Sequence, residues 1–224
     1  MIEINNLVKI YNTGGAETRA LNGVSFKISK GEFVAIVGPS GCGKSTLMHI
    51  MGCLDTPTAG KYFLNKQDVS LLSKDELAEI RANQIGFVFQ SFNLLPQISI
   101  LRNTMLPLIY THTPKNQREA LARKMLKEVN FDESHFYHFS NQLSGGQMQR
   151  AAIARALINN PAIILADEPT GNLDSKNTEI IINLFEELNK RGHTIVLITH
   201  ELEIANRAQR IITMKDGQIV NDKN

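Results

Sequence analysis

The chain of 224 residues contains no tryptophan, and aromatic residues make up only 6% of it. This scarcity argues against a surface that stacks single-stranded nucleic acid on aromatic side chains. The formal net charge is only +2, so no excess of positive charge points to a nucleic-acid partner either. The two cysteines, Cys42 and Cys53, are too few for a disulfide framework and are typical of a reducing compartment.

Long apolar segments are lacking as well. The best apolar runs, residues 162–166 and 195–198, have the length of strands and fall far short of the ~18 residues that cross a bilayer. The N-terminal residues include an acid and amides where a signal peptide would have a basic and then an apolar stretch. We therefore expect a cytosolic chain of ordinary globular composition, so that another polypeptide must supply any membrane span.

The spacing of apolar residues predicts alternating strands and helices. Strands are expected over 2–4, 24–28, 33–37, 85–89, 162–166, 194–199 and 210–214, with a turn or loop over 12–18 that contains Gly14 and Gly15. Helices are expected over 44–52, 74–82, 147–160, 175–191, 201–206 and most of 99–130. This order predicts a parallel sheet covered on both faces, with the helical stretch 91–160 as an inserted subdomain.

Residues 38–45, GPSGCGKS, match the phosphate-loop pattern G-x-x-x-x-G-K-[ST] in full. Its glycines let the backbone curl so that successive N–H groups point at phosphate oxygens, and the following helix N-terminus favours negative charge. We expect Lys44 to reach the β- and γ-phosphates and Ser45 to ligate Mg²⁺. Cys42 fills a variable position of the motif and has no histidine near it in sequence, so it is interpreted as a spectator.

Two acids, Asp167 and Glu168, follow the apolar run that precedes them. Adjacent side chains at the end of a strand point in different directions, so the two acids are expected to serve different purposes. In nucleotide-hydrolysing enzymes with a phosphate loop, the acid at such a strand end holds Mg²⁺, which we assign to Asp167. Glu168 is then free to polarise the attacking water.

A second glycine-rich helix start, Leu143-Ser144-Gly145-Gly146-Gln147, lies about a hundred residues after the phosphate loop. It offers another anion site, although a capped helix with no ligand is an equally open interpretation of these residues alone. One nucleotide seldom needs two such cradles from one subunit. A head-to-tail pair of chains would explain both, because a two-fold axis creates two shared sites at once.

The phosphate loop, the LSGGQ segment and the acid pair, in this order, resemble the ATP-binding subunit of ABC transporters over essentially the whole chain. The resemblance implies that Tyr11 stacks on adenine and that Gln90 contacts Mg²⁺ and the attacking water. It also implies that His200 contacts the γ-phosphate and that Asp174 lies on the loop crossing the dimer seam. Without the resemblance, His200 and Tyr11 would be interpreted as ordinary surface or core residues.

Together these interpretations define a complete set of site residues. Nucleotide contacts are expected from Tyr11, Gly38, Ser40, Gly41, Cys42, Gly43, Lys44, Ser45, Thr46, Ser144, Gly145, Gly146, Gln147 and Asp174. Catalytic roles are expected for Glu168, His200, Gln90 and Lys44, and metal contacts for Ser45, Gln90 and Asp167. The implied fold is the α/β phosphate-loop fold of ABC ATPases, with a mostly parallel core sheet, an antiparallel β subdomain and a helical subdomain.

The resemblance further implies one ATP-binding domain over 1–224, in which 1–90 and 161–224 form the nucleotide-binding core and 91–160 the helical subdomain. Segments 51–60, 85–96 and 168–174 resemble the macrolide-exporter (MacB), lipoprotein-release (LolD) and cell-division (FtsE) group. The implied partners are a second copy, an integral membrane permease and an extracytoplasmic adaptor reached through it, with the chain peripheral on the cytoplasmic face of the membrane. An FtsE-like regulatory ATPase without cargo remains open, as does a soluble non-transport ATPase.

The apolar stretch Phe92, Leu94, Leu95 and Pro96 follows Gln90 directly. We expect it to meet the cytosolic helices of the membrane partner and to couple γ-phosphate sensing to that partner. The alternative is that these side chains belong to the core of the helical subdomain.

Overall fold

The computed structural model describes residues 1–14 and 16–223, so Gly15 of the expected turn lies outside the described residues. Its larger sheet has six strands in the order β10-β9-β3-β8-β7-β6. These are β3 (Phe33–Val37), β6 (Ile85–Phe89), β7 (Ile163–Asp167), β8 (Thr194–Ile198), β9 (Arg210–Lys215) and β10 (Gln218–Lys223). All neighbours are parallel except β10, which runs antiparallel to β9. The parallel α/β sheet predicted from the sequence is thereby confirmed.

The strands β3 and β8 are buried at every residue, which explains why they are apolar without alternation. Because β3, β8, β7 and β6 are adjacent and parallel, their carboxyl ends meet at one edge of the sheet. The phosphate loop, the acid pair, His200 and Gln90 lie at these four ends or within two residues of them. Ligands of open α/β sheets bind at this edge, so the topology gathers the predicted site residues of the core.

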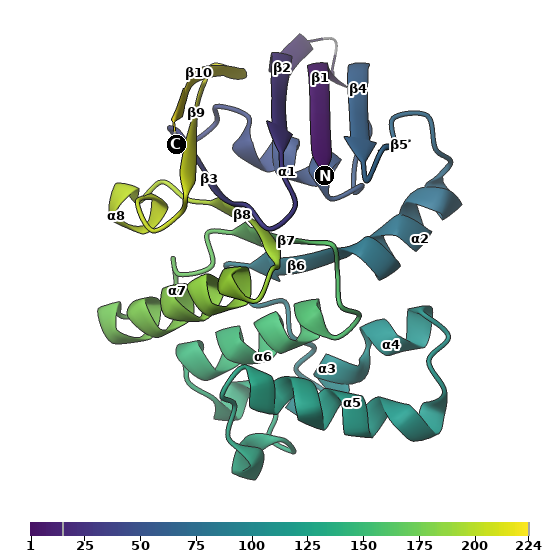
Figure 1. The fold of residues 1–224 in the computed structure, drawn as a ribbon, viewed down its shortest axis with the longest axis vertical. Coiled ribbons are helices and arrows are strands. Elements are labelled where there is room, and N and C mark those ends of the chain that lie inside the picture. The colour runs from purple at the N-terminus through teal and green to yellow at the C-terminus, as the bar shows by residue number, and fades with distance from the viewer. Residues whose placement is uncertain (15, 224) are drawn as a thin grey trace.

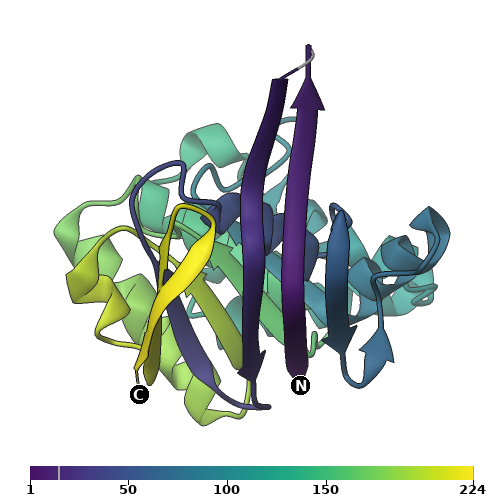
Figure 2. The ribbon, with the colours of Figure 1, turned by 90° about the horizontal axis from the view of Figure 1, so that it is seen from above.

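The smaller sheet is antiparallel, in the order β2-β1-β4-β5. Its strands are β1 (Ile2–Thr13), β2 (Ala16–Ile28), β4 (Ala59–Leu64) and β5 (Gln67–Asp68). The expected loop over 12–18 was wrong for Asn12, Thr13 and residues 16–18, which form a long hairpin (Figure 2). The first four residues of β2 are all exposed, so this part of the hairpin has no alternation of apolar and polar residues to reveal it.

Helices cover both faces of the larger sheet. They are α1 (Lys44–Met51), α2 (Lys74–Gln84), α3 (Ile100–Met105), α4 (Pro107–Tyr110), α5 (Lys115–Glu128), α6 (Gly145–Leu157), α7 (Ser175–Lys190) and α8 (Leu202–Ala205), with short 3₁₀ turns at Glu133–His135 and Ser140–Gln142. Figure 1 shows α3 to α6 gathered at the end of the molecule away from the antiparallel sheet. None of the helices in the described part of the chain is long and apolar enough to cross a bilayer.

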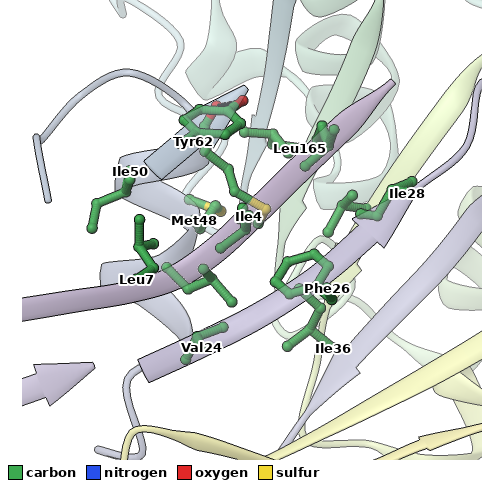
Figure 3. Close-up of a cluster of buried hydrophobic side chains, with 14 of the residues drawn as sticks. Ile4, Leu7, Val24, Phe26, Ile28, Ile36, Met48, Ile50, Tyr62 and Leu165 are labelled. Atoms are coloured by element: carbon green, nitrogen blue, oxygen red, sulfur yellow. Dashed lines mark hydrogen bonds between the residues drawn. The ribbon is translucent and has the colours of Figure 1, made fainter. Parts of the chain in front are cut away.

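Helix α1 lies between the two sheets, and Figure 3 shows the side chains that surround it. Met48 and Ile50 of α1 pack with Ile4 and Phe26 of the antiparallel sheet and with Leu165 of the parallel sheet. Each such side chain contributes about 1.5–3 kcal/mol when fully buried. The helix that carries the phosphate loop is therefore fixed to both sheets at once.

The opposite face of the larger sheet packs against α6 and α7. Ile164 and Ala166 of β7 point to this second core, whereas Ile163 and Leu165 point to the core around α1. Ala154 of α6 belongs to the second core. Because strand side chains alternate in direction, α1 and α6 lie on opposite faces of the same sheet.

Candidate functional site: a nucleotide site

The phosphate loop runs from the end of β3 into the first turn of α1. Gly43 stands before that turn with φ 100°, and a Cβ there would lie 2.4 Å from the carbonyl oxygen of Ala20. Only glycine satisfies both conditions, so the loop depends on this residue. Lys44 is 91% buried, and its Nζ donates to the carbonyl oxygens of Gly38 at 2.7 Å and Pro39 at 2.9 Å. The ammonium group thus lies inside the curl of the loop.

Ser45 and Thr46 follow Lys44 in the first turn of α1, and Ser45 is exposed. Cys42 is buried, as expected of a spectator, with its Sγ 3.9 Å from Lys44 Nζ. Its backbone N–H donates to the carbonyl oxygen of Pro39 at 3.3 Å. The hydroxyl at the mouth of the loop is therefore accessible, whereas the thiol is not.

The acid pair lies at the end of β7, beside the loop. Burial, followed by the adjacent charge of Glu168, raises the pKa of Asp167, and His49 and Lys44 only partly oppose this. Two neighbouring carboxylates whose charge is incompletely balanced are suited to a divalent cation. His49, one turn after Ser45 on α1, is a neighbour of Asp167 that the sequence interpretation did not include.

Glu168 adopts the left-handed conformation, with φ 45°, and its N–H donates to the carbonyl oxygen of Ile198 at 2.9 Å. Its Oε1 lies 2.8 Å from Nδ1 of His200, so residues 32 apart in sequence form a direct pair. Its Oε2 is buried and has no hydrogen-bond partner in the described chain. The hydrogen bond from Glu168, with its negative charge, raises the pKa of His200. One carboxylate oxygen is thus paired with His200, and the other has no partner within the described residues.

Gln90 lies in the loop after β6 and faces the segment after the acid pair. Its Nε2 lies 3.4 Å from Oδ1 of Asn172, whose Nδ2 donates to the Gln90 carbonyl oxygen at 3.0 Å. A Cβ at Gly171 would lie 2.6 Å from Gln90 Nε2, so the glycine makes room for this side chain. The structure therefore joins the loop after β6 to the loop after β7.

Side chains of helix α6 form hydrogen bonds with the loop after β6, and the sequence did not predict these contacts. The Arg155 guanidinium donates to the carbonyl oxygens of Phe92, at 2.8 Å, and Asn93. Both acceptor residues have left-handed φ values, 60° and 51°. Gln149, fully buried on α6, lies with its Nε2 3.5 Å from the Phe89 carbonyl oxygen. These residues are distant in sequence, and no motif spacing signals the contact.

Tyr11 lies in β1, and its hydroxyl donates to Oδ2 of Asp55 at 2.8 Å. Burial, followed by the hydrogen bond to Asp55, raises the pKa of Tyr11, while Thr46 opposes this. Thr46 therefore lies near the phenol, which places the expected adenine-stacking ring near the first turn of α1. Sequence reasoning did not include Asp55 in the site.

Ser144 is the N-cap of α6, which begins at Gly145 rather than at Gln147 as expected. Its hydroxyl accepts from the N–H of Gln147 at 3.3 Å, and Gln147 Oε1 accepts from the N–H of Ser144 at 2.9 Å. This reciprocal cap leaves Ser144 exposed. Asp174 likewise caps α7, and hydrogen bonds from Asn177 lower its pKa. Both caps belong to the helices on the face opposite α1.

The residues at the sheet edge fit a magnesium–nucleotide complex. Mg²⁺ is usually held by one or two carboxylates together with waters and phosphate oxygens, rather than by an all-protein cage. Within residues 1–14 and 16–223, no group of three or more histidine, cysteine or acidic side chains is placed to hold a metal. A site made from the Ser45 hydroxyl, Asp167 and phosphate oxygens agrees with that preference.

Comparison with known proteins adds independent evidence. The ABC transporter family matches residues 21–171. The macrolide export ATP-binding/permease protein MacB of Bdellovibrio bacteriovorus is 52% identical over 100% of this chain, which spans only 34% of that protein. The uncharacterized ABC transporter ATP-binding protein YknY of Bacillus subtilis is 48% identical over 98% of this chain and 95% of its own length. A solved dimeric structure of the ATP-binding cassette MJ0796, in a post-hydrolysis state with ADP and Pi, has a TM-score of 0.91 at 45% identity, covering 100% of this chain and 98% of that one.

Proposed function

This chain is an ATPase of the ABC transporter family, with ATP and Mg²⁺ as its ligands, and from that premise we propose that it drives a membrane permease carried on a separate polypeptide. The proposed cycle is closure of a head-to-tail dimer around two ATP molecules, followed by hydrolysis and opening. The observation that carries the proposal is that α1 and α6 lie on opposite faces of one sheet. Within one chain, the phosphate loop and the Ser144 cap are therefore on different sides of the molecule.

In this proposal each site residue has one task. Backbone N–H groups of the phosphate loop and of the first turn of α1 hold the phosphates, and the Lys44 ammonium offsets the charge that develops on the transferring phosphoryl group. Glu168 orients the attacking water, and His200 holds the Glu168 carboxylate in place through Oε1. Bound Mg²⁺, held by Ser45, Asp167 and Gln90, would supply charge stabilisation at the phosphates. Tyr11 would stack on the adenine.

The second copy would provide Ser144, Gly145, Gly146, Gln147 and Asp174 to the γ-phosphate side of each nucleotide. The N-terminus of α6, a helix of 13 residues, favours an anion through its dipole and free N–H groups. ATP then binds the closed dimer better than the open pair, and this difference in affinity is what drives closure. Loss of the γ-phosphate removes the link between the two copies.

A mixing experiment tests the shared site. Lys44→Ala removes the phosphate-binding ammonium, and Ser144→Arg blocks the cap, so each variant alone should lose ATPase activity. A mixed dimer would contain one site with neither substitution. Random pairing then restores about a quarter of the wild-type rate at most. If both variants fold and bind each other yet the mixture stays inactive, the shared-site proposal is wrong.

We further propose that the permease docks beside the loop after β6. A groove of about 360 Å³ lies there, lined by Phe87, Phe89, Asn93, Tyr110 and Arg155 among others. Of the stretch expected to meet the partner, Leu95 is 49% exposed, whereas Leu94 packs against the core of the helical part. Leu94 therefore supports the alternative of a core role, and the docking proposal rests on Leu95 and the groove.

Substitution of exposed apolar residues tests the docking. Leu95→Asp and Tyr110→Asp should keep folding and basal ATPase activity but lose retention on membranes prepared from the native host. Leu202→Asp, at an apolar position on α8 whose exposure of 65% lies between those of Leu95 and Tyr110, is the matched control and should be retained. Retention of all three variants would exclude this groove as the docking site.

The finer proposals concern the transporter as a whole. The relation to MacB supports a permease of the MacB or LolD type, export of a peptide, macrolide or lipoprotein, and an adaptor outside the membrane. The chain would then be peripheral on the cytoplasmic face of the inner membrane. We also propose the division into a core, 1–90 and 161–224, and a helical subdomain, 91–160, as the two units that move during the cycle. Identification of the protein that retains the chain on membranes tests the partner and distinguishes export from cargo-free regulation.

A further inference from the structure

The hairpin that carries Tyr11 extends beyond its sheet. Strand β1 pairs with β2 from Ile2 with Ile28 to Thr13 with Ala16, with shifts in register between Ile4 and Ile10. It pairs with β4 only as far as Val8. Figure 2 shows the two strands projecting past the rest of the molecule. Tyr11 is therefore beyond the reach of β4, and a two-stranded ribbon on its own is marginally stable.

The loop between α1 and β4 takes over where β4 ends. The N–H of Thr58 donates to the Val8 carbonyl oxygen at 2.8 Å, and Thr58 Oγ1 accepts from the N–H of Ile10 at 3.0 Å. The Lys9 ammonium donates to the Thr56 carbonyl oxygen at 2.8 Å. The loop thus fastens three successive residues of β1 just before Tyr11.

Asp55 is the centre of these contacts, and its carboxylate has a partner at each oxygen. Oδ1 accepts from Lys9 Nζ at 2.6 Å and from the N–H of Thr56 at 2.7 Å. Oδ2 accepts from the Tyr11 hydroxyl at 2.8 Å. Lys9 Nζ also lies 4.9 Å from the centre of the Tyr11 ring. The ring is therefore held by its hydroxyl and by a cation over its ring.

The ionised form of Asp55 fits these contacts. Burial on its own would raise the pKa of this carboxyl group. Hydrogen bonds from Lys9, Tyr11 and the Thr56 N–H outweigh that effect, so the pKa of Asp55 is below its usual value. Both Asp55 and Lys9 are largely covered, with side-chain exposures of 28% and 11%. The anchor is thus a partly buried, charge-assisted contact, which is stronger than a neutral hydrogen bond.

The same residue is fastened to the helix of the phosphate loop. The N–H groups of Leu54 and Asp55 donate to the His49 carbonyl oxygen, at 2.8 Å and 3.2 Å. Asp55 therefore connects the end of α1 to the aromatic ring of β1. A nucleotide has a fixed reach between base and phosphates, so this connection sets the distance that it must span.

We propose that Asp55 is a positioning residue for the nucleobase: it holds the Tyr11 ring at a fixed place relative to the phosphate loop before the nucleotide binds. The inference rests on the proposed role of Tyr11 as the surface on which the base stacks. Without the hydrogen bond from Tyr11 to Asp55, the ring would have to be ordered while the nucleotide binds. Ordering one such side chain weakens nucleotide affinity by about 3–10-fold. The effect concerns the base and leaves the phosphates untouched.

ADP and inorganic pyrophosphate test this separation, because both carry a diphosphate and only ADP has a base. Affinities are measured by calorimetry, directly for ADP and by competition for pyrophosphate. Asp55→Ala should weaken ADP binding about 3–10-fold and leave pyrophosphate unchanged. Tyr11→Phe, which keeps the ring but loses its hydroxyl, should give most of the same loss. Asp55→Asn, which still accepts from the hydroxyl, should restore ADP affinity towards wild type.

Tyr11→Ala measures the stacking itself and should weaken ADP binding about 5–150-fold. The double variant Asp55→Ala with Tyr11→Ala should be no weaker than Tyr11→Ala alone, because Asp55 acts through the ring. Glu3→Ala, which removes an exposed ion pair on the same strand, is the matched control and should behave as wild type.

Three results would overturn the inference in distinguishable ways. If Tyr11→Ala weakens ADP binding while Asp55→Ala and Tyr11→Phe do not, Tyr11 keeps its proposed role and only the anchoring is wrong. If Asp55→Ala weakens pyrophosphate as much as ADP, the residue acts on the phosphate loop instead. If Tyr11→Ala changes neither affinity, the base does not stack there, and the proposed role of Tyr11 fails together with this inference.

Discussion

Replacing Glu168 with glutamine should separate ATP binding from hydrolysis. The amide oxygen can still accept from His200 at the position that is 2.8 Å from Nδ1 in the wild type. The amide nitrogen replaces the buried oxygen that has no partner, and an unsatisfied buried donor costs about 1–3 kcal/mol. This is a fraction of the ~5–15 kcal/mol that stabilises a typical domain, so Glu168→Gln should fold. A side chain that takes up a proton in the transition state typically accelerates a reaction by about 10²–10⁴-fold, so we expect the turnover rate to fall by about that factor.

The assay is phosphate release at saturating ATP and Mg²⁺, together with size-exclusion chromatography in ATP. In ATP, Glu168→Gln should elute as a dimer, because the ATP that links the two copies is no longer cleaved. After ATP is removed, it should elute as a monomer. Glu201→Gln is a matched control, since Glu201 is an exposed acid next to His200. It should hydrolyse ATP as the wild type does. A Glu168→Gln protein that stays monomeric in ATP and turns over within about threefold of wild type would refute the assignment of the water-activating carboxylate.

Three further outcomes follow from single contacts. Tyr62→Phe removes the 2.8 Å bond from a fully buried hydroxyl to the Met51 carbonyl oxygen at the end of α1, and chemical denaturation should report a loss of about 1–3 kcal/mol with the fold intact. Gly43→Ala should abolish ADP binding in calorimetry, because a Cβ would lie 2.4 Å from the Ala20 carbonyl oxygen at a φ of 100°; unchanged affinity would contradict this geometry. The pKa of His200 is raised in the folded chain by its hydrogen bond to Glu168, so this pairing stabilises the fold fully below the unfolded pKa of about 6.5 and less as pH rises through the folded pKa. The difference in melting temperature between wild type and His200→Ala should therefore shrink as pH rises from 6 to 9. A difference that grows over this range would contradict the raised pKa.

The parallel sheet was predictable because its strands carry their own signal. Strands β3, β7 and β8 are continuous apolar runs, and the glycine-rich loop or the acid pair marks the carboxyl end of two of them. Ser45 and Asp167 were both expected to hold Mg²⁺, and the parallel order of their strands places them at one edge of the sheet. The roles of Tyr11 and His200 came only from family resemblance.

The sequence did not predict two kinds of feature: strands that are exposed, short or polar, and contacts between residues distant in sequence. The first four residues of β2 are all exposed and show no alternation, so the end of the hairpin was interpreted as a loop over 12–18. Strands β4, β5 and β10 were not expected because they are short or polar. Asp55 meets Tyr11 across 44 residues and Arg155 meets Phe92 across 63, and neither pair follows a spacing rule.

The position of α1 between two sheets has a consequence for hydrogen exchange. Its Leu47 and Met48 side chains are wholly enclosed, and the N–H groups from Leu47 onward are hydrogen-bonded within the helix, so these amides should exchange slowly. The N–H groups of the first turn have no partner within the helix and lie beside the exposed Ser45, so they should exchange quickly without nucleotide. Nucleotide should therefore slow exchange at the phosphate loop and the first turn of α1, whereas the protection of the rest of the helix comes from the core and should not depend on the ligand.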